Sequence, residues 1–198
     1  MGVVLLVAPS VVAQSQSENS LLIENGPTHG TGYQDSLGAN FNLRYIPITI
    51  KNDSSVTARI QIQFDSFYEN PKGYEEGIYR VFPLPKEWVV DGMTDDDFDV
   101  LWEDFESYVN RPQVSAEIQE GGEFSFVIAT LYPLPAEKWW IVPRQLSVGH
   151  FKQDLKQCDE ITGRDERSQE SGLPFVLQLS HDSGCSLLYC GYVNYLSQ

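Results

Sequence analysis

Residues 56–64 alternate strictly between apolar and polar side chains. Because successive side chains of a β-strand point to opposite faces, this segment has one face for a core and one for solvent. Such a half-buried strand is typical of an antiparallel sheet that is wet on one side. The apolar set is Val56, Ala58, Ile60, Ile62 and Phe64, and the polar set is Thr57, Arg59, Gln61 and Gln63.

The rest of the chain also favours short strands separated by turns. Residues 44–50 are rich in β-forming types and end at the turn cluster 52–55, so we expect them to form a hairpin with residues 56–64. Further strands are expected at residues 78–82, 115–119, 124–132, 139–142, 175–180 and 186–195, the last two joined by a turn at 181–184. The pattern predicts a mostly β fold: a single-domain antiparallel β-sandwich over residues 14–198, immunoglobulin-like or jelly-roll-like.

One amphipathic helix is expected as an insertion between strands, near residues 94–109. Thr94 can cap it, and Asp97 stands where a capping box has its acid. Apolar residues then follow helical spacing until residues 110–112 end the helix. They are Phe98, Leu101, Trp102, Phe105 and Val109. Residues 152–172 are charged and lack apolar periodicity, so we expect a long loop there.

The charge balance excludes polyanionic partners. The 198 residues include 28 acidic and 13 basic side chains, a formal charge of −15, and no basic cluster. Nucleic acid and anionic membranes need such a cluster, so neither is an expected partner. Residues 65–106 alone hold 13 acidic and 3 basic side chains, and we expect this region to attract a basic protein or a cation.

The first 13 residues are uncharged, and residues 3–12 form an apolar run of the length found in signal peptides. Val11 and Ala13 supply small residues for cleavage, although no basic residue precedes the run. We therefore expect residues 1–13 to be a signal peptide, truncated at its start, with an N-terminal strand as the alternative. The run is too short to span a bilayer. The expected protein is secreted or periplasmic, with no transmembrane segment in its mature chain.

Three cysteines lie in the last 41 residues: Cys158, Cys185 and Cys190. In an oxidising compartment two of them should pair. Cys185 and Cys190 are five apart on one expected strand and so point to opposite faces. Cys158 is therefore expected to pair with one of them, with Cys190 favoured because Cys185 lies at a turn. Three buried thiols are the alternative, and the spacing does not fit zinc.

A short motif occurs twice, 50 residues apart: aromatic-Pro-Leu-Pro, a charged link and tryptophan. It begins at Phe82 and at Tyr132, and the prolines should turn the chain between strands. Each tryptophan either fills the core beside such a turn or stands at a surface where it could stack on a sugar ring. The candidate ligand-binding residues are Trp88, Tyr132, Trp139 and Trp140.

The acidic segment from Asp95 to Glu106, within the expected helix, suggests a calcium site. It matches EF-hand ligand positions except that Val100 stands where the loop needs glycine, which excludes a true EF-hand. A looser Ca²⁺ site at Asp91, Asp95 and Asp97 remains as a hypothesis, against a solvated acidic face that stabilises a helix N-terminus. No other cofactor is expected.

Catalytic motifs give no assignment. No nucleophile elbow or phosphate loop occurs, and adjacent His181, Asp182 and Ser183 cannot align as a triad. The leading hypothesis is a secreted, non-catalytic binding module for carbohydrate or an envelope protein. The alternative is a structural or accessory subunit of an extracellular assembly, and the third is a hydrolase with unidentified carboxylates.

Overall fold

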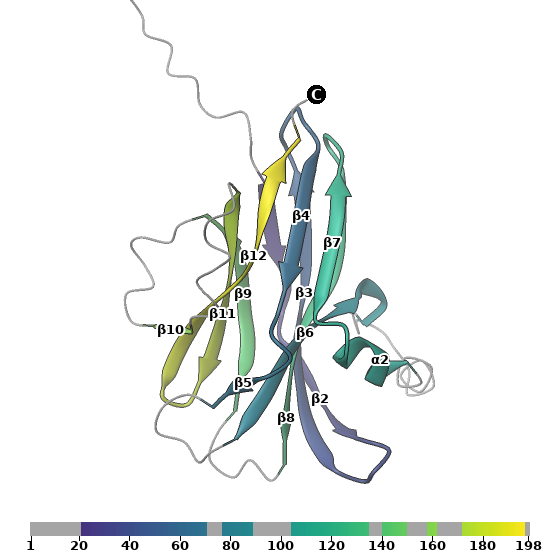
Figure 1. The fold of residues 1–198 in the computed structure, drawn as a ribbon, viewed down its shortest axis with the longest axis vertical. Helices are drawn as coiled ribbons and strands as arrows, with labels where there is room; N and C mark the ends of the chain where they lie inside the picture. Colours follow the sequence, from purple (N-terminus) through teal and green to yellow (C-terminus); the bar gives the residue numbers. More distant parts are fainter. Residues whose placement is uncertain are drawn as a thin grey trace, which may run out of the picture.

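Two six-stranded sheets face each other across the molecule (Figure 1). The computed structural model describes residues 21–70, 77–88, 104–134, 140–149, 158–161 and 172–196. Strands dominate these residues, and the two curled sheets form one sandwich-like domain. The predicted fold class is confirmed. Within the described residues, every strand pairing is antiparallel except that of β10 with β12.

The first sheet has the order β1-β3-β8-β6-β5, and β2 also pairs with β3. Its strands are β1 (Leu21–Asn25), β2 (His29–Gln34), β3 (Asn40–Asn52), β5 (Tyr68–Glu69), β6 (Ile78–Pro85) and β8 (Glu123–Pro133). The second sheet has the order β7-β4-β12-β11-β9, with β10 against β12. Its strands are β4 (Ala58–Gln63), β7 (Gln113–Ile118), β9 (Val142–Val148), β10 (Asp159–Ile161), β11 (Leu173–His181) and β12 (Gly184–Tyr195).

The main core fills the space between the sheets. Ala58 and Ile60 of β4 are fully buried, whereas Arg59 between them is exposed. On β3, Ile48 and Ile50 point into the same core. The alternation read from the sequence thus sets which face of each strand is buried.

The hairpin expected between residues 44–50 and 56–64 is wrong. Both segments are strands, but β3 belongs to the first sheet and β4 to the second, so the turn crosses between the sheets. The turn from β7 to β8 crosses as well. A turn-rich cluster between two strands does not by itself distinguish a hairpin from such a crossing.

Asn52 holds these two crossings together. Its buried side chain donates to the backbone oxygens of Val56 and Ile118, each at 2.8 Å. Its amide oxygen accepts a 2.6 Å hydrogen bond from Ser54. These bonds satisfy buried polar groups at the two places where the chain crosses from one sheet to the other.

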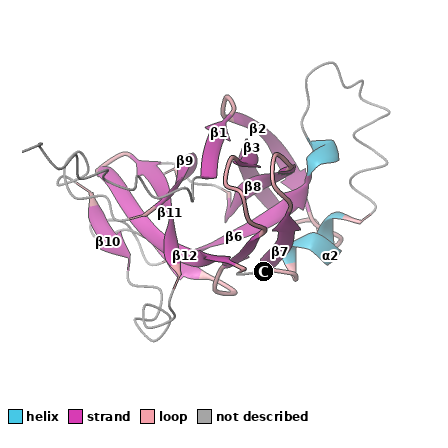
Figure 2. Cartoon of the chain, turned by 90° about the horizontal axis from the view of Figure 1, so that it is seen from above, coloured by secondary structure: helices cyan, strands magenta, loops and turns pink. Residues whose placement is uncertain are grey.

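A second, smaller core lies on the outer face of the first sheet. Along β3 the outward residues change from Leu43 and Tyr45 to Thr49 and Lys51, so only one half of this face needs cover. The cover includes η1 (Lys86–Trp88) and α2 (Phe105–Val109), at one side of the sandwich in Figure 2. Trp88 and Phe105 are fully buried there, with ring centroids 5.3 Å apart.

The predicted helix is confirmed over residues 105–109, and its expected start at residues 94–103 lies outside the described residues. The predicted C-terminal hairpin is confirmed as β11 and β12. Within the expected loop 152–172, residues 159–161 instead form β10, and most of the remainder lies outside the described residues. The expected signal peptide at residues 1–13 lies there too.

Candidate functional site

A groove of about 490 Å³ opens beside the hairpin of β2 and β3. The described residues that line it carry no charged side chain, and they combine aromatic, aliphatic and amide groups. The lining residues are Gly32, Tyr33, Gln34, Asn40, Phe41 and Leu134.

The hairpin register brings the lining residues together. Tyr33 stands opposite Phe41, and Gln34 stands opposite Asn40. The end of β8 joins them because the Leu134 N–H donates to the Asn40 carbonyl at 2.8 Å. The groove therefore depends on pairing between strands rather than on one loop.

The turn between β2 and β3 is stabilised by the side chain of Asp35 and by Gly38. The carboxylate of Asp35 accepts hydrogen bonds from the N–H groups of Leu37 and Ala39, at 3.0 and 2.7 Å. Gly38 has a φ of 84°, a left-handed conformation that glycine adopts without steric cost. Both features fix the turn that sets the register of the groove.

The aromatic wall of the groove is anchored to the second core. The ring of Tyr33 lies 4.5 Å from that of Phe105 and 6.0 Å from that of Phe41, measured between centroids. The Tyr33 hydroxyl donates to Glu106 at 3.4 Å, and Ser36 donates to the same oxygen at 3.2 Å. Partial burial, and then the nearby Glu106 carboxylate, raise the pKa of Tyr33, so its phenol stays neutral at physiological pH.

The polar part of the groove consists of two exposed amides. Gln34 Nε2 donates to Asn40 Oδ1 at 3.2 Å. A primary amide has two donor hydrogens and an acceptor oxygen, so the pair can both donate to and accept from a ligand. Gly32 adds room, because a Cβ built there meets nothing within 4 Å. The arrangement suits a neutral ligand with hydroxyl groups and an apolar face.

The aromatic surface expected from the repeated motif is wrong for two of its four residues. Trp88 is buried in the second core, and Tyr132 is buried on the inner face of β8 in the main core. Trp140 keeps 37% of its surface exposed, and Trp139 lies outside the described residues. For Trp88 the structure shows the other interpretation, in which the tryptophan fills a core beside proline-containing strand β6.

The candidate calcium residues Asp91, Asp95 and Asp97 lie outside the described residues. Within the described ranges, no three His, Cys, Asp or Glu side chains gather as a metal site.

The disulfide joins Cys158 to Cys185, with Cα atoms 4.6 Å apart, and not to Cys190 as expected. The parallel pairing of β10 with β12 sets Asp159 opposite Ser186, which brings the preceding residues Cys158 and Cys185 side by side. Cys190 instead points into the main core as a free thiol. Burial raises its pKa and keeps it protonated. The expectation that Cys185 and Cys190 face opposite ways is confirmed.

His181 is the last residue of β11 and is buried. Ser183 Oγ lies 2.8 Å from its Nδ1, and Ser186 Oγ lies 3.0 Å from its Nε2. Asp182 is exposed in the turn. The cluster is a hydrogen-bonded strand end, as the sequence predicted.

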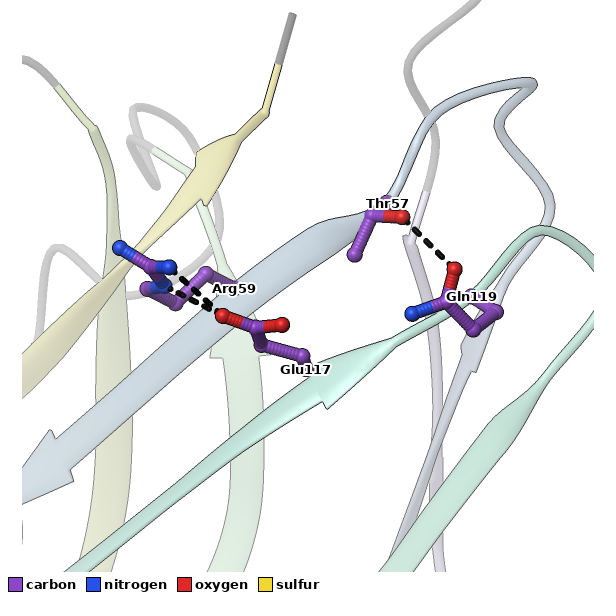
Figure 3. Close-up of polar contacts among 4 residues, drawn as sticks. All are labelled: Thr57, Arg59, Glu117 and Gln119. Carbon is purple, nitrogen blue, oxygen red and sulfur yellow. Dashed lines mark hydrogen bonds and ion pairs between the residues drawn. The ribbon is translucent and has the colours of Figure 1, made fainter. Parts of the chain in front are cut away.

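A polar face covers the outside of β4 and β7 (Figure 3). Arg59 reaches across to Glu117, with Nη2 at 2.6 Å and Nε at 3.0 Å from the same carboxylate oxygen. Thr57 donates to Gln119 at 2.9 Å in the same row. These cross-strand pairs keep the charged groups of this face engaged with one another.

Comparisons with protein families, with curated proteins and with solved structures find no match for this chain. Among the described residues, no helix is long and apolar enough to cross a membrane.

Proposed function

We propose that this protein is a non-catalytic binding module that takes a neutral carbohydrate into the groove between β2, β3 and the end of β8. One observation carries the proposal. In a chain with a formal charge of −15, the lining that the structure describes has no charged side chain and combines two aromatic rings with two amides.

The lining matches the chemistry of a sugar ring. A pyranose has an apolar C–H face and a rim of hydroxyl groups that donate and accept hydrogen bonds. Tyr33 and Phe41 supply half-buried rings held in place by the second core, which lowers the entropy lost on binding. Gln34 and Asn40 supply donors and acceptors at the rim.

The proposed location is outside the cytoplasm. The Cys158–Cys185 disulfide supports an oxidising compartment. The apolar segment at residues 3–12 supports export by a signal peptide.

Calorimetric titration with neutral hexasaccharides of glucose, xylose, mannose and N-acetylglucosamine tests the proposal. We expect saturable binding of at least one. The double variant Gln34→Ala with Asn40→Ala should weaken it about tenfold or more, because each lost hydrogen bond is worth about 1 kcal/mol. Gln145→Ala removes an exposed amide from β9 and is the matched control. The absence of saturable heat with all four sugars, or an unaffected double variant, would contradict the groove as a sugar site.

The structure also supports the alternative of an accessory subunit, because β7 ends the second sheet and no other described strand pairs with its outer edge. A hydrolase receives no support from the groove, since none of its described lining residues carries a carboxylate.

A further inference from the structure

The second sheet ends at β7, whose only ladder within the described residues is with β4 (Figure 1). The pattern of that ladder tells which backbone groups are free. Phe64 N donates to Pro112 O at 2.7 Å, so this opposed pair is a hydrogen-bonded one. Antiparallel pairs alternate between bonded and non-bonded. The N–H and C=O groups of Gln113, Ser115 and Glu117 therefore point away from β4, along what we call the open edge.

The open edge lacks the features that usually block strand addition. β6 shows such a block, because Pro83 and Pro85 lie in its ladder with β8 and must turn their nitrogens outward. Residues 113–118 contain no proline and no inward-pointing charge. The charged side chain of β7, Glu117, lies on the solvent face and is held by Arg59.

The open edge also has an apolar inner row. Val114 and Ala116 are half-buried and pack against the main core, and Ile118 is buried. An added strand with apolar residues at every second position would cover Val114 and Ala116 and extend that core.

The charge of the protein indicates which kind of segment could pair with the open edge. The protein carries −15, so a second copy would meet strong repulsion. Asp104, just before α2, and Glu120, just beyond β7, are exposed acids near the two ends of the strand. Arg111 is an exposed base at the first of these ends, Arg80 donates to Asn110 there at 3.4 Å, and Arg59 is engaged with Glu117. The formal charge of −15 on the whole chain favours a cationic partner.

We propose that the open edge of β7 accepts an extended, basic segment of another protein, with alternating apolar residues, as an additional strand. This site is separate from the groove, so either proposal can fail without the other.

The test uses an acetylated heptapeptide, lysine–valine–threonine–valine–lysine–valine–threonine amide, and a matched peptide with glutamate for lysine. We expect the lysine peptide alone to bind, and to slow amide exchange at Ser115 and Glu117 more than at neighbouring positions that already bond β4. Equal binding of the two peptides, or protection elsewhere, would overturn the proposal.

Variants at one position sharpen the test. Ser115→Pro removes a donor that faces outward and should weaken the peptide at least tenfold with little change in thermal midpoint, whereas Ser115→Ala should bind normally. If Ser115→Pro does not fold, the exchange measurement on the natural chain still decides. Unchanged binding by a folded Ser115→Pro variant refutes strand addition. A concentration-dependent dimer, lost in that variant, would instead show a second copy as the occupant.

Discussion

The edge strands on the two sides of the sandwich differ in whether their outward backbone groups have hydrogen-bond partners. On one side β1 and β9 meet, and Asn25 joins them: its Nδ2 donates to Leu146 O at 3.0 Å, and its Oδ1 accepts from Leu146 N at 2.7 Å. Thr28 adds a 3.2 Å bond to Pro143 O. We call this side the closed seam. On the other side, β7 carries the open edge.

The comparison shows that one amide side chain can stand in for a strand. Asn25 presents the same donor and acceptor as a peptide unit, so it satisfies an edge that would otherwise attract other chains. The polar side chains of β7 point to the solvent face instead, where Arg59 and Glu117 bind each other. Whether a side-chain amide can satisfy an edge strand therefore depends on its position along the strand and on the face to which it points.

The largest loss of stability is expected for Gly191→Ala, which disturbs the pairing of β12 with β4, the strand next to the open edge. Gly191 has a φ of 148°, and a Cβ there would press on the Gln61 backbone carbonyl of β4. Backbone strain and a forced shift of β4 should lower the free energy of unfolding by about 3 kcal/mol or more. Urea denaturation measures this. Gly121→Ala, at φ 66° with open space, should cost only about 1–2 kcal/mol, and equal losses would contradict the steric explanation.

Asn25→Ala should open the closed seam and lower the free energy of unfolding by about 2 kcal/mol, because it leaves the N–H and C=O of Leu146 without the Asn25 amide as their partner. Amide exchange at Leu146 should accelerate, while exchange along β7 stays as it was. Asn40→Ala, at an exposed asparagine, is the control for stability. If Leu146 keeps its protection, the seam does not depend on Asn25.

A pH titration tests whether the covered outer face of the first sheet behaves as a true core. Burial raises the pKa of Tyr45 from 10.0 to about 12. The unfolded chain then ionises first, so this contribution to stability is complete below pH 10 and is lost as the pH rises towards 12. Unfolding followed by circular dichroism should show a smaller loss over this interval in Tyr45→Phe. Identical slopes for both proteins would argue against a dry environment.

The smallest effect is expected for Arg59→Ala. Both partners of its ion pair with Glu117 are about half exposed, so the loss should be under about 1 kcal/mol and should shrink at high salt. Glu117→Gln should behave alike. A loss greater than that of Asn25→Ala, and insensitive to salt, would mean that the polar face near the open edge contributes more to folding than the closed seam does.

The sequence predicted the features that depend on local periodicity. Alternation in residues 56–64 identified the buried face of β4, and the turn at 181–184 identified the last hairpin. The sequence did not show that β3 and β4 belong to different sheets. That separation depends on the hydrogen bond from Asn52 to the carbonyl of Ile118, a residue 66 positions away.

The candidate site was harder to predict. The repeated motif left Trp88 either in the core or at a surface, and it is buried by Phe105 on the outer face of a sheet, where a simple sandwich has solvent. The groove was not predicted because no strand was expected at residues 29–34, where the structure has β2. Tyr33 and Phe41 on either side of a turn that contains Asp35 and Gly38 were the available signal for a hairpin.

The disulfide between Cys158 and Cys185 has a consequence for how the chain can be cut. It closes a covalent ring of the intervening residues, which include β10 and β11. A single proteolytic cut anywhere between residues 159 and 184 would leave the two fragments linked, so β9 and β12 would stay on one molecule. The damaged protein would run as an intact chain on a gel until a reducing agent separates it, and strand β12 would keep its place in the sheet after the backbone is broken.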